Sequence, residues 1–214
     1  MCKKIFIVSL VAVLTVNYAQ AQVIFGARAG FNMTNLYQKD ANGDKVGLDW
    51  RPGFQIGVIA DYPFLFEDLS IQPGILFATQ GAKSEKTLLG YKTKINFNLN
   101  YIQVPINLQY KQDLDNMILL LQAGPYLGFG IGGKKEIEIS EGGTKVSSSE
   151  KIKFGSGDDA DFKAFDFGLG FGAGLQFGNL QAVLSYNLGL VKLDPDVDLK
   201  NIGLALTVTY FFGK

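Results

Sequence analysis

The sequence predicts an all-β protein, folded as a closed antiparallel up-and-down barrel of about eight strands. Apolar and polar residues alternate with a period of two along nearly the whole chain after the first 21 residues, and no sustained helical stripe interrupts them. The polar positions hold mostly Gly, Ser, Thr, Asn and Gln, while most charged residues fall between the predicted strands. The connections are alternately long and short. These three observations together indicate a sheet that closes on itself.

The first 21 residues read as a signal peptide. A short basic start with Lys3 and Lys4 precedes an apolar stretch, and Ala19-Gln20-Ala21 forms a small-x-small cleavage site. An uncleaved anchor is the alternative, but the apolar run of about a dozen residues is shorter than the roughly 20 that a spanning helix needs. We therefore expect residues 1–21 to be removed and residues 22–214 to form one barrel domain.

The strands are predicted from the alternation, which is clearest in residues 164–177. From Phe165 to Phe177 every odd position is Phe, Leu or Ala, and every even position is Gly, Asp or Gln. A helix would scatter both sets around its circumference. Gly178-Asn179 then supplies a tight turn into the next strand. The other predicted strands are residues 23–33, 50–62, 68–82, a fourth segment that ends near Lys111, 117–133, 180–193 and 202–212.

The fourth segment changes phase. Its apolar residues occupy odd positions up to Tyr101 and even positions from Ile102 to Tyr110. A β-bulge produces such a shift of one residue, and Pro105, which has no amide proton to donate, also indicates irregular pairing. The alternative is that the part before Tyr101 projects beyond a bilayer. The bulge is the preferred interpretation by a small margin.

Alternation alone does not separate a soluble barrel with an apolar interior from a membrane barrel with an apolar exterior. Small, uncharged residues on the polar face suit the crowded interior of a small barrel, whereas a water-facing surface is normally rich in Lys and Glu. Bacterial outer-membrane barrels also join their strands by long extracellular loops and short periplasmic turns. The long connections here are 34–49, 83–91, 134–163 and 194–199, and the short ones are 63–67, 112–116 and 178–179. We therefore expect an outer-membrane barrel with both mature termini in the periplasm.

Composition excludes several function classes. Cys2 leaves with the signal peptide, and the mature chain then contains no Cys and no His, which removes thiolate nucleophiles, disulfides and histidine-based catalysis or metal binding. Asp194, Asp196 and Asp198 alternate as in a calcium loop, but Leu199 stands where such a loop needs glycine. Without Lys3 and Lys4 the chain has 18 basic and 20 acidic residues, so no basic field attracts nucleic acid. We expect no catalytic residues, no cofactor and no metal.

Four segments of the chain carry a resemblance to a known family. They are Gly26-Ala27-Arg28-Ala29-Gly30-Phe31-Asn32, Tyr101-Ile102-Gln103-Val104-Pro105-Ile106, Gln122-Ala123-Gly124-Pro125-Tyr126 and Leu184-Ser185-Tyr186-Asn187-Leu188-Gly189-Leu190. With these segments the sequence resembles the Bacteroidetes outer-membrane β-barrel family often called porin-like or PorT-like. The resemblance covers essentially the whole mature chain and implies a fold and a compartment, without a defined activity.

Four polar residues are predicted to face the lumen, namely Arg28, Asp61, Gln122 and Asp166. They could line a polar pathway, or they could form a structural network of ion pairs and hydrogen bonds that fills a closed barrel. The second interpretation is favoured because eight strands leave little free bore.

The segment 134–163 is the longest predicted connection and the best candidate for a surface that binds an extracellular or envelope protein. The favoured alternative is a solvated or partly hairpin-forming loop without a ligand. The leading hypothesis is a monomeric, non-enzymatic barrel, embedded in outer-membrane lipid, with a structural, surface-interaction or envelope-assembly role. A narrow channel for small solutes or ions is the second hypothesis. A secreted soluble barrel that binds an apolar ligand is the third.

Overall fold

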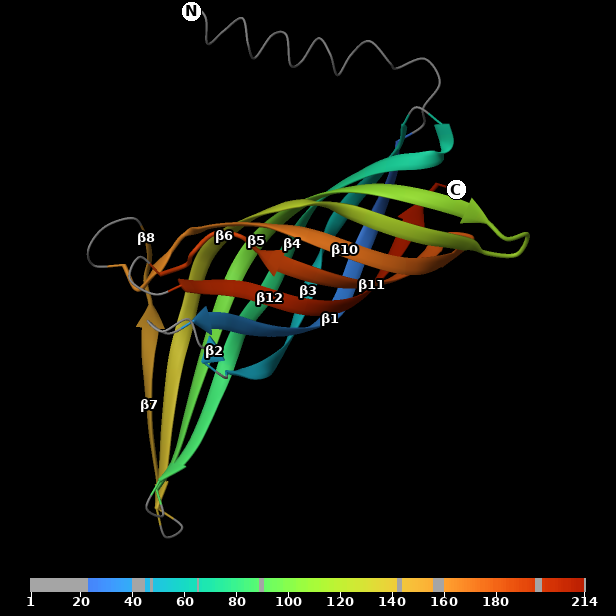
Figure 1. The fold of residues 1–214 in the computed structure, drawn as a ribbon. Helices are drawn as coiled ribbons and strands as arrows, with labels where there is room; N and C mark the ends of the chain where they lie inside the picture. The colour runs from blue at the N-terminus through green and yellow to red at the C-terminus, as the bar shows by residue number, and fades with distance from the viewer. Residues whose placement is uncertain are drawn as a thin grey trace, which may run out of the picture.

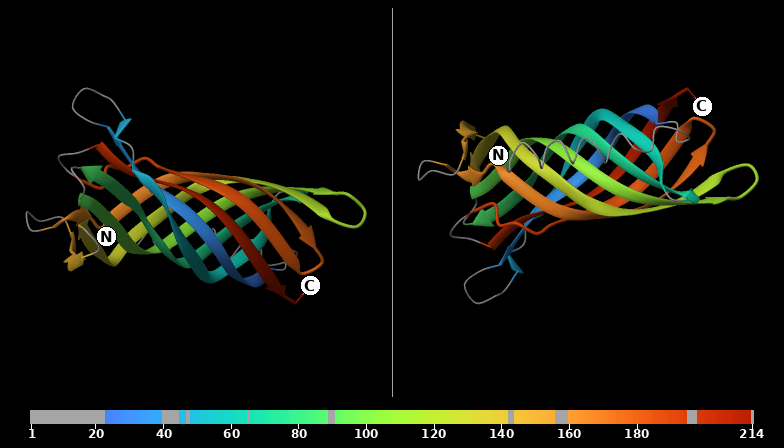
Figure 2. Two further views of the ribbon diagram at one scale, coloured as in Figure 1. Left: turned by 90° about the horizontal axis from the view of Figure 1, so that it is seen from below. Right: turned by 90° about the horizontal axis from the view of Figure 1, so that it is seen from above.

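Eight long strands close into a barrel in the computed structural model (Figures 1 and 2). The structure describes residues 23–39, 45–46, 48–64, 66–88, 91–141, 144–155, 160–194 and 198–213, so the predicted signal peptide lies outside the described residues. Neighbouring strands pair antiparallel around the ring, and β6 pairs back with β10 to close it. The ring consists of β1 (Ile24–Lys39), β3 (Asp49–Phe64), β4 (Phe66–Leu88), β5 (Tyr91–Asp113), β6 (Ile118–Glu141), β10 (Phe165–Phe177), β11 (Leu180–Gly189) and β12 (Asp198–Phe212). The predicted fold class is confirmed.

The apolar residues of the alternating pattern point outward. Phe25, Leu184 and Leu206 are 62%, 58% and 56% exposed, whereas Thr207 and Thr209, in the same strand as Leu206, are buried inside. An exposed apolar belt with a polar interior is the arrangement that suits lipid, because ring closure satisfies the backbone hydrogen bonds that a bilayer cannot. No helix long and apolar enough to span a membrane occurs in the described part of the chain.

The short connections lie together at one end of the barrel. Gly178 adopts a positive φ of 54°, which glycine tolerates without strain, and forms the predicted two-residue turn with Asn179. In the turn between β5 and β6, the Leu114 amide donates a hydrogen bond to the Met117 carbonyl at 2.9 Å. Phe25 pairs with Phe212, so the first and last strands of the barrel begin and end side by side at this end.

Three strands continue past the ring at the opposite end and form a projecting sheet with β7 (Thr144–Ile152). The projecting sheet comprises residues 81–88 of β4, 91–99 of β5, 132–141 of β6 and all of β7, and it narrows to a tip in Figure 1. The predicted loop at 83–91 is therefore wrong over most of its length, whereas 134–163 contains the hairpin of β6 and β7 that the partly hairpin-forming interpretation expected. Lys, Glu and Ser interrupt the apolar pattern there, yet hairpin pairing still satisfies the backbone of both strands.

The predicted β-bulge in the fourth segment is also wrong. The pairing of β4 with β5 is continuous from Leu76–Gln103 to Leu88–Tyr91, and the irregularity lies in the partner strand β6, between Gly130 and Gly132. The alternation of side chains in β5 never changes phase. Instead, the apolar residues of β5 within the ring lie on its outer face, and those beyond the ring lie on the face toward the barrel axis. The segment before Tyr101 therefore projects beyond the ring, as the alternative interpretation expected.

An apolar cap covers the end of the lumen beneath the projecting sheet. It consists of Leu36, Ala82, Leu99, Tyr101, Ile152, Phe162, Leu193 and Leu199. Part of the cap comes from the segment after β7, where β8 (Phe154–Gly155) pairs in parallel with β9 (Phe162–Lys163). The Phe154 ring packs edge-on against Tyr101 with centroids 5.5 Å apart. A short strand β2 (Lys45–Val46) pairs with the end of β1.

Candidate functional site

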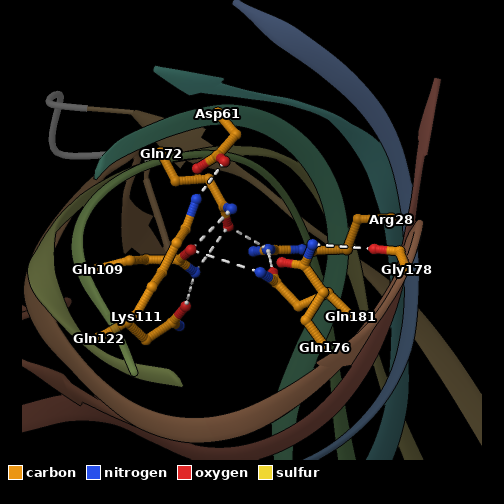
Figure 3. A network of polar contacts seen from close by, with 9 residues as sticks. All are labelled: Arg28, Asp61, Gln72, Gln109, Lys111, Gln122, Gln176, Gly178 and Gln181. Atoms are coloured by element: carbon orange, nitrogen blue, oxygen red, sulfur yellow. Dashed lines mark hydrogen bonds and ion pairs between the residues drawn. The ribbon is translucent and has the colours of Figure 1, made fainter. Parts of the chain in front are cut away.

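The lumen half near the short turns is organised around Arg28 of β1, which is 4% exposed (Figure 3). Its Nε donates to the hydroxyl of Thr209 at 2.9 Å, and its Nη2 donates to the side-chain carbonyls of Gln72 and Gln181. All three acceptors are neutral. Buried guanidinium groups need such partners because an unsatisfied charge in a low-dielectric interior is strongly unfavourable.

Four glutamines extend this network across the lumen. The glutamine girdle comprises Gln72 of β4, Gln109 of β5, Gln122 of β6 and Gln181 of β11 (Figure 3). Gln109 is at the centre of the girdle. Its Nε2 donates to Gln122 at 2.8 Å and to Gln72 at 3.2 Å, and its Oε1 accepts a hydrogen bond from Gln181 at 3.4 Å. A carboxamide can both donate and accept, and these hydrogen bonds connect strands from opposite sides of the ring.

Asp61 of β3 forms an ion pair with Lys111 of β5 beside the girdle (Figure 3). The two side chains are 3% and 14% exposed, so the pair is largely removed from water. Arg28 adds a second, longer-range attraction to Asp61. The carboxylate therefore neutralises positive charge that would otherwise be isolated inside the barrel.

Asp166 belongs to a different cluster, nearer the projecting sheet. Its Oδ2 accepts a hydrogen bond from Asn201 Nδ2 at 2.9 Å and from the Tyr126 hydroxyl at 3.3 Å. Asp166 lies opposite Gly128 on β6, whereas the girdle contacts the same strand at Gln122. Asp166 is therefore hydrogen-bonded outside the girdle network.

The four residues predicted to face the lumen all lie inside the barrel, but they do not form one constellation. Arg28 and Gln122 share the girdle network, Asp61 pairs with Lys111, and Asp166 bonds to neutral groups. Sequence reasoning missed Lys111, although a usable signal exists. Polar residues occupy the odd positions Gln103, Asn107, Gln109 and Lys111 of β5, which marks that face as the inner one.

The space left in the lumen is small. Between the girdle and the apolar cap lie two cavities of about 40 and 10 Å³. A single water needs about 10–15 Å³ on this measure, so these spaces hold from one to a few waters. The described side chains therefore narrow the lumen at the girdle and again at the cap.

A wider pocket of about 330 Å³ lies on the outer side of the cap, at the base of the projecting sheet. Its floor is apolar and includes Leu36, Phe97 and Phe162, and its rim carries charges of both signs, such as Lys135 and Asp161. Asp161 is held by a hydrogen bond from the Lys153 amide at 2.8 Å. An apolar group that entered from this end would meet the pocket before reaching the lumen.

The projecting sheet is stabilised by surface ion pairs and leaves one strand edge open. Glu85 pairs with Lys92 at 2.5 Å and with Lys94 at 3.8 Å. The hydrogen bond from Lys92 lowers the pKa of Glu85 below its ordinary value. Among the described residues β7 pairs only with β6, and every residue from Thr144 to Lys151 is exposed.

Residues 18–194 match the family described as "Outer membrane protein beta-barrel domain". The chain belongs to this family. As an outer-membrane β-barrel protein it has its apolar belt in the lipid of the outer membrane, and the closed ring of strands crosses that lipid.

Several solved outer-membrane proteins are similar to this barrel along nearly the whole chain. Ail of Yersinia pestis is 20% identical with a TM-score of 0.42, and the alignment covers 89% of this chain and 99% of Ail. Neisserial surface protein A is 16% identical with a TM-score of 0.45, covering 90% and 99%. A major outer membrane protein from Thermus thermophilus is 14% identical with a TM-score of 0.40, covering 89% and 99%. No match was found among curated proteins.

Proposed function

We propose that this chain is a non-enzymatic, monomeric outer-membrane barrel with a structural, surface-interaction or envelope-assembly role. Within its family we place it among the porin-like, PorT-like barrels of Bacteroidetes. In this proposal the signal peptide is cleaved, the end with the short turns faces the periplasm, and the projecting sheet faces outward to contact an extracellular or envelope protein. The single observation that carries the proposal is a lumen narrowed at two levels beneath an exposed sheet.

The narrowed lumen favours a scaffold over a channel. A solute would have to displace the girdle, whose glutamines are bonded to one another and to Arg28. It would also have to pass the apolar cap, in which Leu99 and Tyr101 are fully buried. Both layers are packed by side chains from several strands, so opening either one requires breaking buried contacts.

The absence of catalysis is proposed from the residues available. The predicted mature chain has no His or Cys to serve as base or nucleophile. The buried carboxylate Asp166 accepts hydrogen bonds from Tyr126 and Asn201, so its partners come from the barrel itself. The lumen polar groups are therefore assigned a structural role.

The partner surface is proposed from the open edge of β7. An exposed edge strand presents unpaired N–H and C=O groups that can pair with an extended segment of another protein. Charges at Lys145 and Lys151 and the serines Ser147, Ser148 and Ser149 keep this edge soluble without blocking its backbone.

Planar-bilayer recordings test the closed lumen. We expect the purified, folded full chain to give no reproducible conductance steps, because the girdle and the cap interrupt the lumen. The folded state is checked by heat-modifiable mobility on gels. Reproducible channels from the wild-type chain, with a conductance that changes in Arg28→Ala or Asp166→Asn, would favour the narrow channel instead.

Photo-crosslinking in intact cells tests the partner surface. A photoreactive residue at Ser148 is expected to give a discrete protein adduct, and Val146→Pro is expected to reduce its yield because proline removes a backbone donor from the β7 edge. A photoreactive residue at Asn116, in a turn at the other end of the barrel, is the control. The same adduct from both positions, or no protein adduct from Ser148, would contradict the proposal.

A further inference from the structure

A hollow of about 450 Å³ lies across β5, β6 and β7, just beyond the point at which β10 stops pairing with β6. β10 pairs with β6 as far as Phe129, and β7 pairs with it from Gly133 onward, so the intervening stretch of β6 borders both strands (Figure 1). Besides the backbone of Gly132, Gly133 and Ile152, the hollow is lined by Asn98, Asn100, Lys134, Glu136 and Lys151.

The strand register places the polar side chains of the hollow on the outer face. Leu99 and Ile152 point inward, because both belong to the apolar cap. Their neighbours in sequence, Asn98 and Lys151, therefore point outward, and both lie beside Lys134 in the pairing of the three strands. The hollow thus opens away from the lumen, on the side that carries the lipid-facing belt.

Lys134 and Lys151 face each other directly across β6 and β7. Like charges in this relation repel, which makes the pairing unfavourable unless an anion lies between them. Among the described residues neither ammonium lies within ion-pair distance of a carboxylate, whereas Lys92 and Lys145 of the same sheet are paired with Glu85 and Glu138. Glu136 lines the hollow as well, so two positive charges there oppose one negative charge.

The hollow begins at the level where the lipid-facing belt ends. Directly below it, Ile131, Phe129 and Phe165 are 58%, 45% and 43% exposed on the outer surface. Beyond Ile131 the outward positions change to Gly132 and Lys134. A lipid whose acyl chains lie against these three apolar residues would hold its headgroup beside the two lysines. This continuity favours a membrane lipid over a free anion as the occupant.

We propose that this hollow binds the phosphate of a phosphorylated outer-leaflet lipid, an inference that rests on the proposed orientation with the projecting sheet facing outward. Lys134 and Lys151 supply the charge, the carboxamides of Asn98 and Asn100 donate hydrogen bonds to the phosphate oxygens, and Gly132 leaves room for close approach. Glu136 opposes the same phosphate and limits the affinity. The bound lipid removes the repulsion between the lysines and ties the base of the projecting sheet to the membrane surface.

Native mass spectrometry of the detergent-solubilised full chain, titrated with lipid A as a phosphorylated glycolipid probe, tests this site. The double substitution K134Q/K151Q is expected to weaken lipid binding about tenfold, because it removes charge-assisted hydrogen bonds to the phosphate. Glu136→Gln is expected to strengthen it. The matched control K92Q/K145Q removes two lysines from the far part of the same sheet and is expected to leave binding within about twofold, because surface charge there is screened.

Two further arms decide the source and the specificity. Phosphatidylcholine tests a zwitterionic lipid and inorganic phosphate tests the free anion, and both are expected to bind more weakly than lipid A. Equal losses in the two double variants would indicate diffuse charge attraction and overturn the site. Unchanged lipid binding in K134Q/K151Q would also overturn the proposed site. Inorganic phosphate that binds as tightly as the lipid would overturn it as well. None of the substituted residues is buried, and heat-modifiable mobility checks that each variant remains folded.

Discussion

Replacing Asp61 with asparagine is expected to destabilise the barrel by about 3–5 kcal/mol, because it leaves a buried ammonium without its carboxylate. The Lys111 side chain is only 14% exposed, so water cannot compensate fully for the lost partner. Asp61 also attracts Arg28, and that attraction is lost in the same variant. Urea unfolding of the protein in lipid vesicles, followed by heat-modifiable mobility, measures the change.

The double variant D61N/K111M separates the charge effect from a packing effect. Removing both members of a buried pair, with an apolar side chain of similar length in place of lysine, should recover much of the lost stability. Lys111→Met alone is expected to be destabilising too, since it leaves the Asp61 carboxylate buried and unpaired. A double variant as unstable as D61N would show that the ion pair is not the source of the effect.

The Gly124→Ala substitution is expected to cost about 3 kcal/mol or more, at or beyond the upper end of ordinary overpacking effects. A Cβ atom at this position would lie 2.0 Å from the Ile106 carbonyl oxygen and 2.8 Å from the Asn107 Cα. These are backbone atoms of the neighbouring strand β5, so no side-chain rotation can relieve the contact. The strands would have to separate, which weakens a closed ring as a whole. The yield of the heat-modifiable folded form and its urea midpoint report the loss.

Gly132→Ala is the matched control for Gly124→Ala, because a Cβ at Gly132 would meet nothing within 4 Å. Both glycines are in β6, so both substitutions change the same strand by one methyl group. We expect a change within about 0.5 kcal/mol for Gly132→Ala, as for ordinary surface substitutions. Equal effects in the two variants would mean that strand propensity decides the outcome rather than the space inside the barrel.

Most of the barrel could be predicted from sequence, but the ends of its strands could not. The period-two alternation marks strands wherever one face meets lipid, as in residues 164–177. Beyond the lipid that contrast disappears, because both faces of a projecting hairpin meet water or loops. The segment Glu136-Ile137-Glu138-Ile139 still alternates, but its charged residues indicate a connection between strands. In the structure, β6 continues through it to Glu141.

The lumen residues were predicted as a set, but their partners were not. Inward-facing positions follow from alternation within a strand, which is how Arg28, Asp61 and Asp166 were found. Which of them meet depends on the register and tilt of eight strands around the ring, a relation between residues far apart in the chain. Asp61 therefore pairs with Lys111, 50 positions away, and not with Arg28 or Asp166.

The sequence by itself determined the fold class, the outward direction of the apolar side chains in the ring, and the absence of His and Cys from the predicted mature chain. These features are local, since they follow from residue type and from the two-residue period of a strand. Only the tertiary structure decided where side chains narrow the lumen, that β4 to β7 project as one sheet, and that Lys134 faces Lys151. These features arise from pairing between strands, and the energy of each pairing depends on neighbours that the local pattern does not specify.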